Sequence, residues 1–268
     1  MFRTECSESA IGVANPQACP MPDDRRRISV TRTDASRQNR LLAALSRVDF
    51  ECLQPHLKRA SLSLGEVLCE PRRPLRQAYF PTTSIVSKSC GLSNGTSAEI
   101  AVVGNEGLVG VDDIMGVGSL LCRVVVQSSG FAYQLEAERL REEVARSGAM
   151  QQLFLRYTQA LITQMAQAAV CNRHHTVDQQ LCRWLLLSLD RSSSSEIAWT
   201  QESIAKNHGV RRESVTDAAG KLQHAGLIRY RRGRIAVLNR SGLEARTCEC
   251  YAVVKNECDR LLPPTMGF

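Results

Sequence analysis

The segment from Thr200 to Leu238 constrains the fold of this chain more than any other part of the sequence. Thr200 is a favourable N-cap for a short helix over 201–207, and Gly209 can adopt the positive φ of a tight turn. A second helix is expected over 211–223, with its apolar side chains gathered on one arc. This spacing predicts a helix-turn-helix, a motif that places its second helix in the major groove of DNA.

The other arc of this second helix carries groups that can hydrogen-bond to base edges. They are Glu213, Thr216, Asp217 and His224, with Arg212 on the flank. Two β-rich runs, 227–230 and 235–238, flank an arginine-rich tip and predict a β-hairpin, or wing. Residues 196–240 hold nine Lys and Arg against four Asp and Glu, which is a net +5 of the chain's +7. The positive charge is therefore concentrated where a phosphate backbone would pass.

Composition excludes several other classes of protein. The 268 residues, 43% apolar and 23% charged, are typical of a globular chain with one large domain or two ordinary ones. No apolar run approaches the ~18 residues of a membrane span, and no export signal follows Met1, so we expect a cytoplasmic protein. The 11 cysteines are odd in number and irregularly spaced, which favours reduced thiols over a disulfide scaffold.

The first half of the chain changes character twice. Residues 1–36 show little apolar periodicity and are expected to form a mobile tail. A short helical pattern covers 41–57, and nine of the 17 glycines then lie between Gly65 and Gly130. They separate short β-rich runs, which predicts an antiparallel barrel or roll that encloses a small ligand or is filled by its own side chains.

A long helix follows the roll, and it carries apolar residues on two sides. One stripe has heptad spacing and consists of Met150, Phe154, Tyr157, Leu161, Gln164, Ala168 and Cys171. The second consists of Leu155, Ile162, Ala166 and Ala169. One interpretation is a helix lying on its own barrel. We favour a helix with two partners, in which the second stripe covers the barrel and Met150, Phe154, Tyr157, Leu161 and Ala168 form a dimer interface.

The order of these parts resembles the Crp/Fnr superfamily of bacterial transcription regulators from about Leu41 to Tyr251. The motifs that carry the resemblance are Tyr79-Phe80-Pro81, Val103–Val111, Thr200-Gln201-Glu202 and Gly209–Val215. The resemblance implies an α+β fold: an antiparallel β-roll like cyclic-nucleotide-binding domains, a long dimerisation helix and a winged helix-turn-helix. The expected boundaries are a tail at 1–36, the roll at 37–140, the long helix at 141–175, the winged domain at 176–255 and a C-terminal tail at 256–268.

By this resemblance, Arg212 and Glu213 occupy base-reading positions and Gln201 a phosphate-contacting one. Asp217 stands where the family often has arginine, so the usual operator sequence is not expected, and His208 replaces an aliphatic residue. The expected DNA-contacting residues are Gln201, Arg211, Arg212, Glu213, Ser214, Thr216, Asp217, Arg231, Arg232 and Arg234.

The expected function is therefore sequence-specific DNA binding by a homodimer on a near-palindromic operator, with RNA polymerase as a further partner if the protein activates. The alternative is a ligand- or thiol-sensing module whose winged domain contacts protein. No catalytic motif is recognisable, so an enzyme is not expected.

The resemblance also suggests which signals to exclude. Val111 follows Gly110 where cyclic-nucleotide binders have glutamate, and residues 119–122 lack the arginine that would pair with the cyclic phosphate. An unpaired phosphate is costly to bury, so cyclic-nucleotide dependence is not expected. Cys6 and Cys19 are too few for an iron–sulfur cluster.

Several cysteines stay open to interpretation, although no metal or other cofactor is expected. Cys171, His174 and His175 have helical metal-pair spacing but do not complete a four-coordinate zinc site, so a helix-end cluster is favoured. Cys248, Cys250 and Cys258 fit no common ligand spacing. Cys182 is either a redox thiol beside Arg183 or, as we favour, a core residue.

Overall fold

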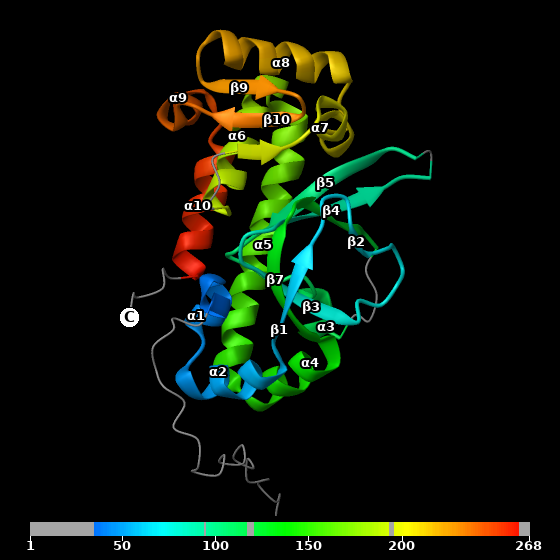
Figure 1. The fold of residues 1–268 in the computed structure, drawn as a ribbon, viewed down its shortest axis with the longest axis vertical. Helices are drawn as coiled ribbons and strands as arrows, with labels where there is room; N and C mark the ends of the chain where they lie inside the picture. The colour runs from blue at the N-terminus through cyan, green and yellow to red at the C-terminus, as the bar shows by residue number, and fades with distance from the viewer. Residues whose placement is uncertain (1–34, 94, 117–120, 193–195, 263–268) are drawn as a thin grey trace, which may run out of the picture. The chain divides into compact units, whose positions relative to one another are not determined.

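The structure is a computed structural model that describes residues 35–93, 95–116, 121–192 and 196–262 (Figure 1). Residues 1–34 of the expected tail lie outside the described residues. Ala35 and Ser36, which were also assigned to that tail, begin the 3-10 helix η1 (Ala35–Gln38). Ser36 is 1% exposed, so these two residues belong to the folded domain and the predicted boundary after residue 36 is too late.

Two short helices and a 3-10 turn stand where one helical pattern was expected. They are α1 (Arg40–Ala44), α2 (Arg47–Leu53) and η2 (Gln54–His56). The break follows from Ser46, whose hydroxyl accepts the Asp49 N–H and starts a new helix. Asn39 is completely buried as the N-cap of α1, and its amide donates to the Pro81 and Gly107 carbonyls at 2.9 and 2.8 Å. This side chain anchors the first helix to the roll.

The β-roll is built from two antiparallel sheets. The first has the order β1 (Lys58–Leu62), β7 (Gly130–Glu136), β3 (Gln77–Pro81). The second has the order β2 (Val67–Cys69), β6 (Arg123–Ser128), β4 (Ile85–Gly91), β5 (Ser97–Val103), and the short helix α3 (Val111–Ile114) follows β5. Aliphatic side chains of both sheets pack together in one core, which contains Leu62, Val86, Val124 and Ala132. The antiparallel roll predicted from the sequence is confirmed.

The long helix α5 (Gly148–His174) follows α4 (Ala137–Arg146), and Ser147 separates the two by accepting the Met150 N–H. One face of α5 packs against the roll (Figure 1). That face is the stripe predicted to form the dimer interface, since the side chains of Met150, Phe154, Tyr157, Leu161 and Ala168 are only 1–6% exposed within the chain. The assignment of the two stripes was therefore wrong.

The opposite stripe of α5 is the one left uncovered. Leu155 and Ile162 are 51% and 52% exposed, and Val170 is 47% exposed. The large side chains Phe154 and Tyr157 fill the space beside the roll, and the smaller aliphatic residues of the other stripe face outward.

The winged helix-turn-helix domain follows α5. Its elements are α6 (Val177–Asp190), β8 (Glu196–Ala198), α7 (Gln201–His208), α8 (Arg212–His224), β9 (Ile228–Arg231), β10 (Arg234–Val237) and α9 (Arg240–Arg246). The three strands form an antiparallel sheet of order β8-β10-β9. Trp184 of α6 and Trp199 stack with ring centroids 3.4 Å apart in the core of this domain.

The chain continues as a helix beyond the point where a C-terminal tail was predicted. Helix α10 (Cys250–Leu261) packs along α5 and also contacts α6 (Figure 1). Its residues Tyr251 and Val254 join the core of the winged domain, while Cys258 and Leu262 join the core beneath the roll. Residues 256–261 are thus helical, and residues 263–268 lie outside the described part. Among the described helices, none has the length and apolarity needed to cross a bilayer.

Candidate nucleic-acid interface

The turn between α7 and α8 has the geometry expected of a helix-turn-helix. Thr200 caps α7 by accepting the Ser203 N–H at 3.1 Å, and Gly209 ends it at φ 65°. The Val210 N–H donates to the Ala205 carbonyl at 3.0 Å, which directs the chain into α8. Val215 and Ala218, both completely buried, hold the inner face of α8 in the domain core.

The outer face of α8 collects most of the predicted DNA-contacting residues. Arg211, Arg212, Glu213, Thr216 and Asp217 are exposed, and Ser214 is half-buried. Asp217 is paired with Lys221 one turn later at 2.7 Å, and Lys221 also lies 3.7 Å from Asp178. The Asp217 carboxylate therefore has a partner within its own helix, which competes with any contact to a base.

Gln201 is half-buried at the start of α7 and touches the outer face of α8. Its side-chain oxygen accepts the Thr216 hydroxyl at 3.0 Å, and its backbone N–H donates to the Tyr230 hydroxyl at 3.2 Å. These contacts join α7, α8 and the first wing strand at one point. They hold Gln201 at the helix N-terminus, a position suited to a phosphate because the helix dipole and the backbone N–H groups face it.

The wing is the β9–β10 hairpin with its tip at Arg232 and Gly233. Both tip residues have positive φ, 49° and 73°, as a two-residue hairpin turn requires. Arg231, Arg232 and Arg234 are exposed. The Trp199 N–H donates to the Gly233 carbonyl at 2.7 Å, which ties the tip to the segment before α7. The wing therefore presents three guanidinium groups on a supported hairpin.

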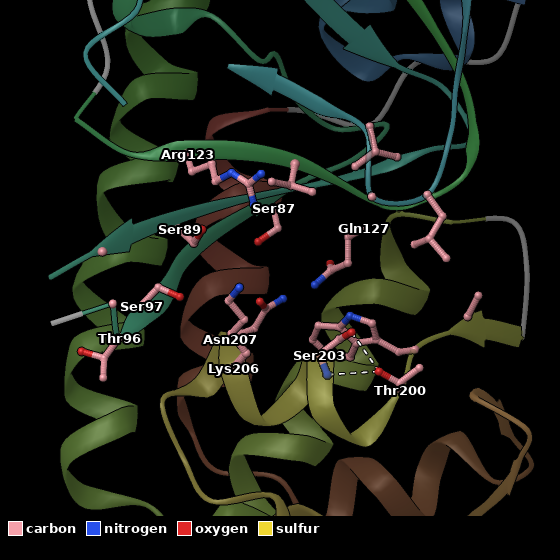
Figure 2. Close-up of a pocket in the computed structure, with 18 of the residues that line it drawn as sticks. Ser87, Ser89, Thr96, Ser97, Arg123, Gln127, Thr200, Ser203, Lys206 and Asn207 are labelled. Atoms are coloured by element: carbon pink, nitrogen blue, oxygen red, sulfur yellow. Dashed lines mark hydrogen bonds between the residues drawn. The ribbon is translucent and has the colours of Figure 1, made fainter. Parts of the chain in front are cut away.

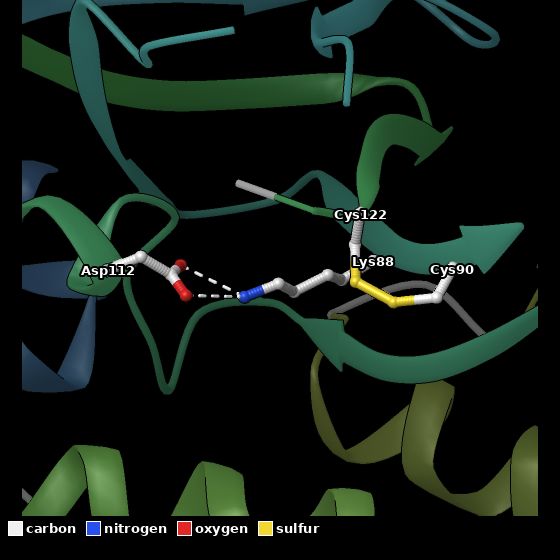
Figure 3. The surroundings of a disulfide bond; sticks show 4 residues. All are labelled: Lys88, Cys90, Asp112 and Cys122. Atoms are coloured by element: carbon white, nitrogen blue, oxygen red, sulfur yellow. Dashed lines mark hydrogen bonds and ion pairs between the residues drawn. A yellow bond between two sulfur atoms is a disulfide. The ribbon is translucent and has the colours of Figure 1, made fainter. Parts of the chain in front are cut away.

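The interior of the roll, where a small effector was considered, is filled. The Lys88 ammonium donates to both carboxylate oxygens of Asp112 at 2.9 Å (Figure 3). The void beside this pair measures about 20 Å³ and is lined mainly by aliphatic side chains, among them Val86, Val124 and Leu161. Ligand pockets for small molecules usually measure about 300–1,000 Å³, so this void is too small for one.

A disulfide corrects the prediction that the thiols are reduced. Cys90 near the end of β4 and Cys122 just before β6 are bonded to each other, and their Cα atoms are 4.4 Å apart (Figure 3). Irregular spacing concealed the pair, because 32 residues separate the two cysteines in sequence and only the β4–β6 pairing brings them together. Cys182 is completely buried in α6, and burial raises its pKa to about 11, the opposite of a reactive thiol.

A larger pocket, which the sequence did not predict, lies between the roll and α7. It measures about 520 Å³ (Figure 2). Ser87, Ser89 and Gln127 line it from the strands, and Lys206 and Asn207 line it from α7.

Glu99 of β5 connects the roll side of this region to α7. Its carboxylate accepts hydrogen bonds from the Ser87 hydroxyl at 2.7 Å and from the side-chain amides of Gln127 at 2.9 Å and Asn207 at 3.4 Å. Burial raises the pKa of Glu99 to about 7.

A buried ion pair joins the roll to the end of α6, and sequence reasoning missed it. The Arg191 Nε donates to Glu106 at 2.6 Å, and the two side chains are 5% and 8% exposed. The remaining guanidinium donors reach the Gln164 side chain and the Leu187 carbonyl, both at 3.0 Å. Gly104 allows this approach, since a Cβ there would lie 2.5 Å from the Arg191 Cβ. The glycine-rich segment 104–107 therefore forms a joint between the two domains.

Comparisons with known proteins agree with this architecture. Residues 179–246 match the family model for the Crp-like helix-turn-helix domain. FixK2 from Bradyrhizobium japonicum is 15% identical with a TM-score of 0.59, over 72% of this chain and 98% of that one. A putative Crp/Fnr-family transcriptional regulator from Eubacterium rectale is 14% identical with a TM-score of 0.56, over 75% and 94%.

A third similar structure is that of a c-di-GMP-responsive global regulator, CLP, from Xanthomonas campestris. It is 14% identical with a TM-score of 0.51, over 70% of this chain and 97% of that one. No curated protein sequence matches this chain. At these identities the solved structures establish the fold, and the helix-turn-helix match establishes the type of the C-terminal domain.

Proposed function

We propose that this chain is a transcription regulator of the Crp/Fnr superfamily and that it binds a near-palindromic operator as a homodimer without a cyclic nucleotide. Its Crp-like helix-turn-helix domain and its fold support the proposal. The observation that carries the proposal is the surface formed by α8 and the wing. It combines hydrogen-bonding groups on an exposed helix face with three exposed arginines on the adjacent hairpin. A protein-binding role for the winged domain does not by itself explain that concentration of arginine, whereas a phosphate backbone does.

Two kinds of DNA contact are assigned to this surface. Arg212 lies in the first turn of α8, where a guanidinium can bind guanine bidentately, and Glu213 can accept from cytosine. Arg232 lies at the wing tip, where the phosphate backbone is the group in reach. Gln201, Arg211, Ser214, Thr216, Arg231 and Arg234 are assigned to phosphate or to adjacent bases. Asp217 contributes only if it releases Lys221.

The exposed stripe of α5 supports a homodimer. Leu155, Ile162, Ala166 and Ala169 recur at intervals of seven, four and three residues, as in a coiled coil, and are exposed. The roll already covers the other side of the helix. A twin helix packed on this stripe would bury it. Such a dimer would have a two-fold axis, and the two α8 helices related by it would occupy successive major grooves, about 34 Å apart.

The roll interior supports independence from cyclic nucleotides. Lys88 is the cation nearest the small void, and Asp112 already neutralises it. A cyclic phosphate placed there would lack a free partner cation and would need space that aliphatic side chains occupy. We therefore expect operator binding by the protein alone.

Selection of binding sites from a random duplex pool tests the proposal. The wild-type protein, Arg212→Ala, Arg232→Ala and the control Arg76→Ala, an exposed arginine on the roll, are compared at two salt concentrations. Cyclic AMP and cyclic GMP are added in parallel. We expect a palindromic motif that neither nucleotide changes. Arg212→Ala should flatten one symmetric position at a cost of ~1–3 kcal/mol.

Arg232→Ala should keep the motif but lose affinity, with a salt slope lower by about one for each lost contact, or about two in a dimer. The control should match wild type. Enrichment of no motif would contradict the function and favour a protein-binding winged domain. A motif altered by Arg232→Ala and left intact by Arg212→Ala would show that the reading face is assigned to the wrong element.

A further inference from the structure

Four potential metal ligands from distant parts of the chain meet where α5 ends and α10 begins. Cys171 lies in the last turn of α5, and His175 is its C-cap residue. Cys248 lies between α9 and α10, and Cys250 is the first residue of α10. Their ligating atoms all lie within 4.8 Å of one another. His174, which the sequence grouped with Cys171 and His175, is exposed and lies outside this cluster.

Two distances within the cluster are close to the edges of a tetrahedron around a zinc ion. With Zn–S of about 2.3 Å and Zn–N of about 2.0–2.1 Å, tetrahedral geometry places two sulfurs about 3.8 Å apart and a sulfur and a nitrogen about 3.6 Å apart. The Cys171 and Cys248 sulfurs are 3.5 Å apart. The Cys250 sulfur is 3.6 Å from His175 Nδ1. Three thiols and one imidazole are also a common donor set of structural zinc sites.

The surroundings of the four ligands suit a bound cation. Cys171, Cys248 and Cys250 are 0–3% exposed and form a separate core cluster of their own. The Nε2 atom of His175 faces the Glu249 carboxylate at 3.3 Å, while its Nδ1 atom faces the sulfurs. A carboxylate on the outer nitrogen is the arrangement that orients metal-bound histidines and increases their basicity.

A buried arginine balances the charge that zinc would leave. Three thiolates exceed the charge of one Zn²⁺ by a single negative charge. Arg183 of α6 is 6% exposed and interacts electrostatically with Cys171 and Cys250. Among the described residues, its Nε atom has no hydrogen-bond partner. A guanidinium nitrogen buried without a partner is costly, and a negatively charged zinc–thiolate centre nearby would compensate part of that cost.

We propose that Cys171, His175, Cys248 and Cys250 bind one Zn²⁺ in a closed, tetrahedral structural site. All four coordination positions are filled by protein, which distinguishes such a site from a catalytic one. The sequence alone favoured a helix-end cluster because Cys171, His174 and His175 do not complete a four-coordinate zinc site. Folding brings the other two from 73 to 79 positions further along the chain. The ion would fasten the end of α5 to the start of α10, the helix that contacts both domain cores.

Metal titration of the full-length, reduced, metal-stripped protein tests the site. We expect one equivalent of Co²⁺ to bind with the intense visible d–d bands of tetrahedral coordination and with sulfur-to-cobalt charge-transfer absorption. One equivalent of Zn²⁺ should abolish both signals and raise the melting temperature. Cys250→Ser should lose part of the charge-transfer intensity, because two of the three thiolates remain, and should bind zinc far more weakly. Cys52→Ser, a change in α2 outside the cluster, should behave as wild type.

Glu249→Gln provides a variant that tests the site without removing a ligand. The Glu249 side chain is 76% exposed, so this change should leave the fold intact. It should weaken zinc affinity about 10–100-fold in competition with a chromophoric chelator while the cobalt spectrum keeps its tetrahedral form. If Cys250→Ser does not fold, this affinity change decides the matter.

Three results would overturn the proposal. The first is the absence of stoichiometric tetrahedral Co²⁺ binding by the reduced wild-type protein. The second is a zinc affinity that Glu249→Gln leaves unchanged. The third is a Cys171–Cys248 disulfide, mapped by mass spectrometry, that persists when the protein is prepared with zinc and without oxidant.

Discussion

Removing the charge of Glu106 should destabilise the protein more than any surface substitution. Glu106→Gln keeps the size of the side chain but leaves the Arg191 guanidinium buried without a counter-ion. Breaking a buried pair from one side costs ~3–5 kcal/mol of unfolding free energy. Arg191 retains its bonds to Gln164 and Leu187, so we expect the lower end, about 3 kcal/mol. Arg191→Met loses all three donated bonds and should cost about 4–5 kcal/mol.

The double variant Glu106→Gln/Arg191→Met separates the ion pair from the packing around it. Because the double variant leaves no buried charge behind, its loss of unfolding free energy should be about 2–3 kcal/mol smaller than the sum of the losses in the two single variants. The four proteins are compared by urea denaturation followed by far-ultraviolet circular dichroism, and the Arg47→Ala variant, at an exposed position in α2, serves as the control. Single costs that simply add, with a coupling energy below about 0.5 kcal/mol, would refute the view that this pair joins the two domains.

Three further predictions follow from other parts of the structure. Ile162→Asp should give a folded monomer in analytical ultracentrifugation with weakened operator binding, and a wild-type protein that is monomeric at micromolar concentration would contradict the dimer. Burial lowers the pKa of His208 from 6.5 to about 3. Its contribution to the free energy of unfolding is therefore fully present above pH 6.5 and is lost progressively as the pH falls from there toward 3. Between pH 7 and pH 5 the wild type should lose about 2 kcal/mol more than His208→Leu in urea denaturation, and equal losses would show that His208 titrates normally. Cys90→Ser removes the Cys90–Cys122 disulfide, whose cysteines are 32 positions apart, and should lower the free energy of unfolding by about 3–4 kcal/mol. An unchanged melting temperature would contradict a stabilising role for this disulfide.

The helix-turn-helix and the wing could be predicted because their signals are local. The N-cap Thr200, the turn residue Gly209 and the apolar arc of α8 all lie within a few turns of one another. Each favours the same structure, so no distant contact was needed to choose between alternatives. The strands of the roll were recognisable for a similar reason, since glycines separate them at short intervals.

The faces of α5 could not be assigned from sequence because both stripes have helical spacing. The choice depends on residues far away in the chain. The Tyr157 hydroxyl donates to the Leu108 carbonyl at 3.0 Å, and Gly107 leaves room for the ring. The one sequence feature that distinguishes the two stripes is side-chain size. The buried stripe has the larger side chains, and the space between a helix and a β-roll accommodates larger side chains than a helix–helix contact does.

The cysteine contacts and the ion pair were missed because they join residues distant in sequence. Cys90 and Cys122 meet through strand pairing, and Glu106 and Arg191 meet through domain docking. Cys171 and Cys248 approach each other because α10 folds back along α5. The second half of α10 was predicted to be a tail, so its packing against α5 was not foreseen. A pattern of residue types carries no information on such contacts until the topology is known.

The stacked indole rings of Trp184 and Trp199 give the protein an optical signal confined to one domain. They are the two tryptophans of the whole chain, and both are buried in the core of the winged domain, 1% and 4% exposed. Tryptophan emission on excitation near 295 nm therefore reports the solvation of that core, and the roll, which has tyrosine and phenylalanine but no tryptophan, contributes nothing to it. Loosening of the winged domain would shift the emission to longer wavelength even while the strands of the roll stayed intact.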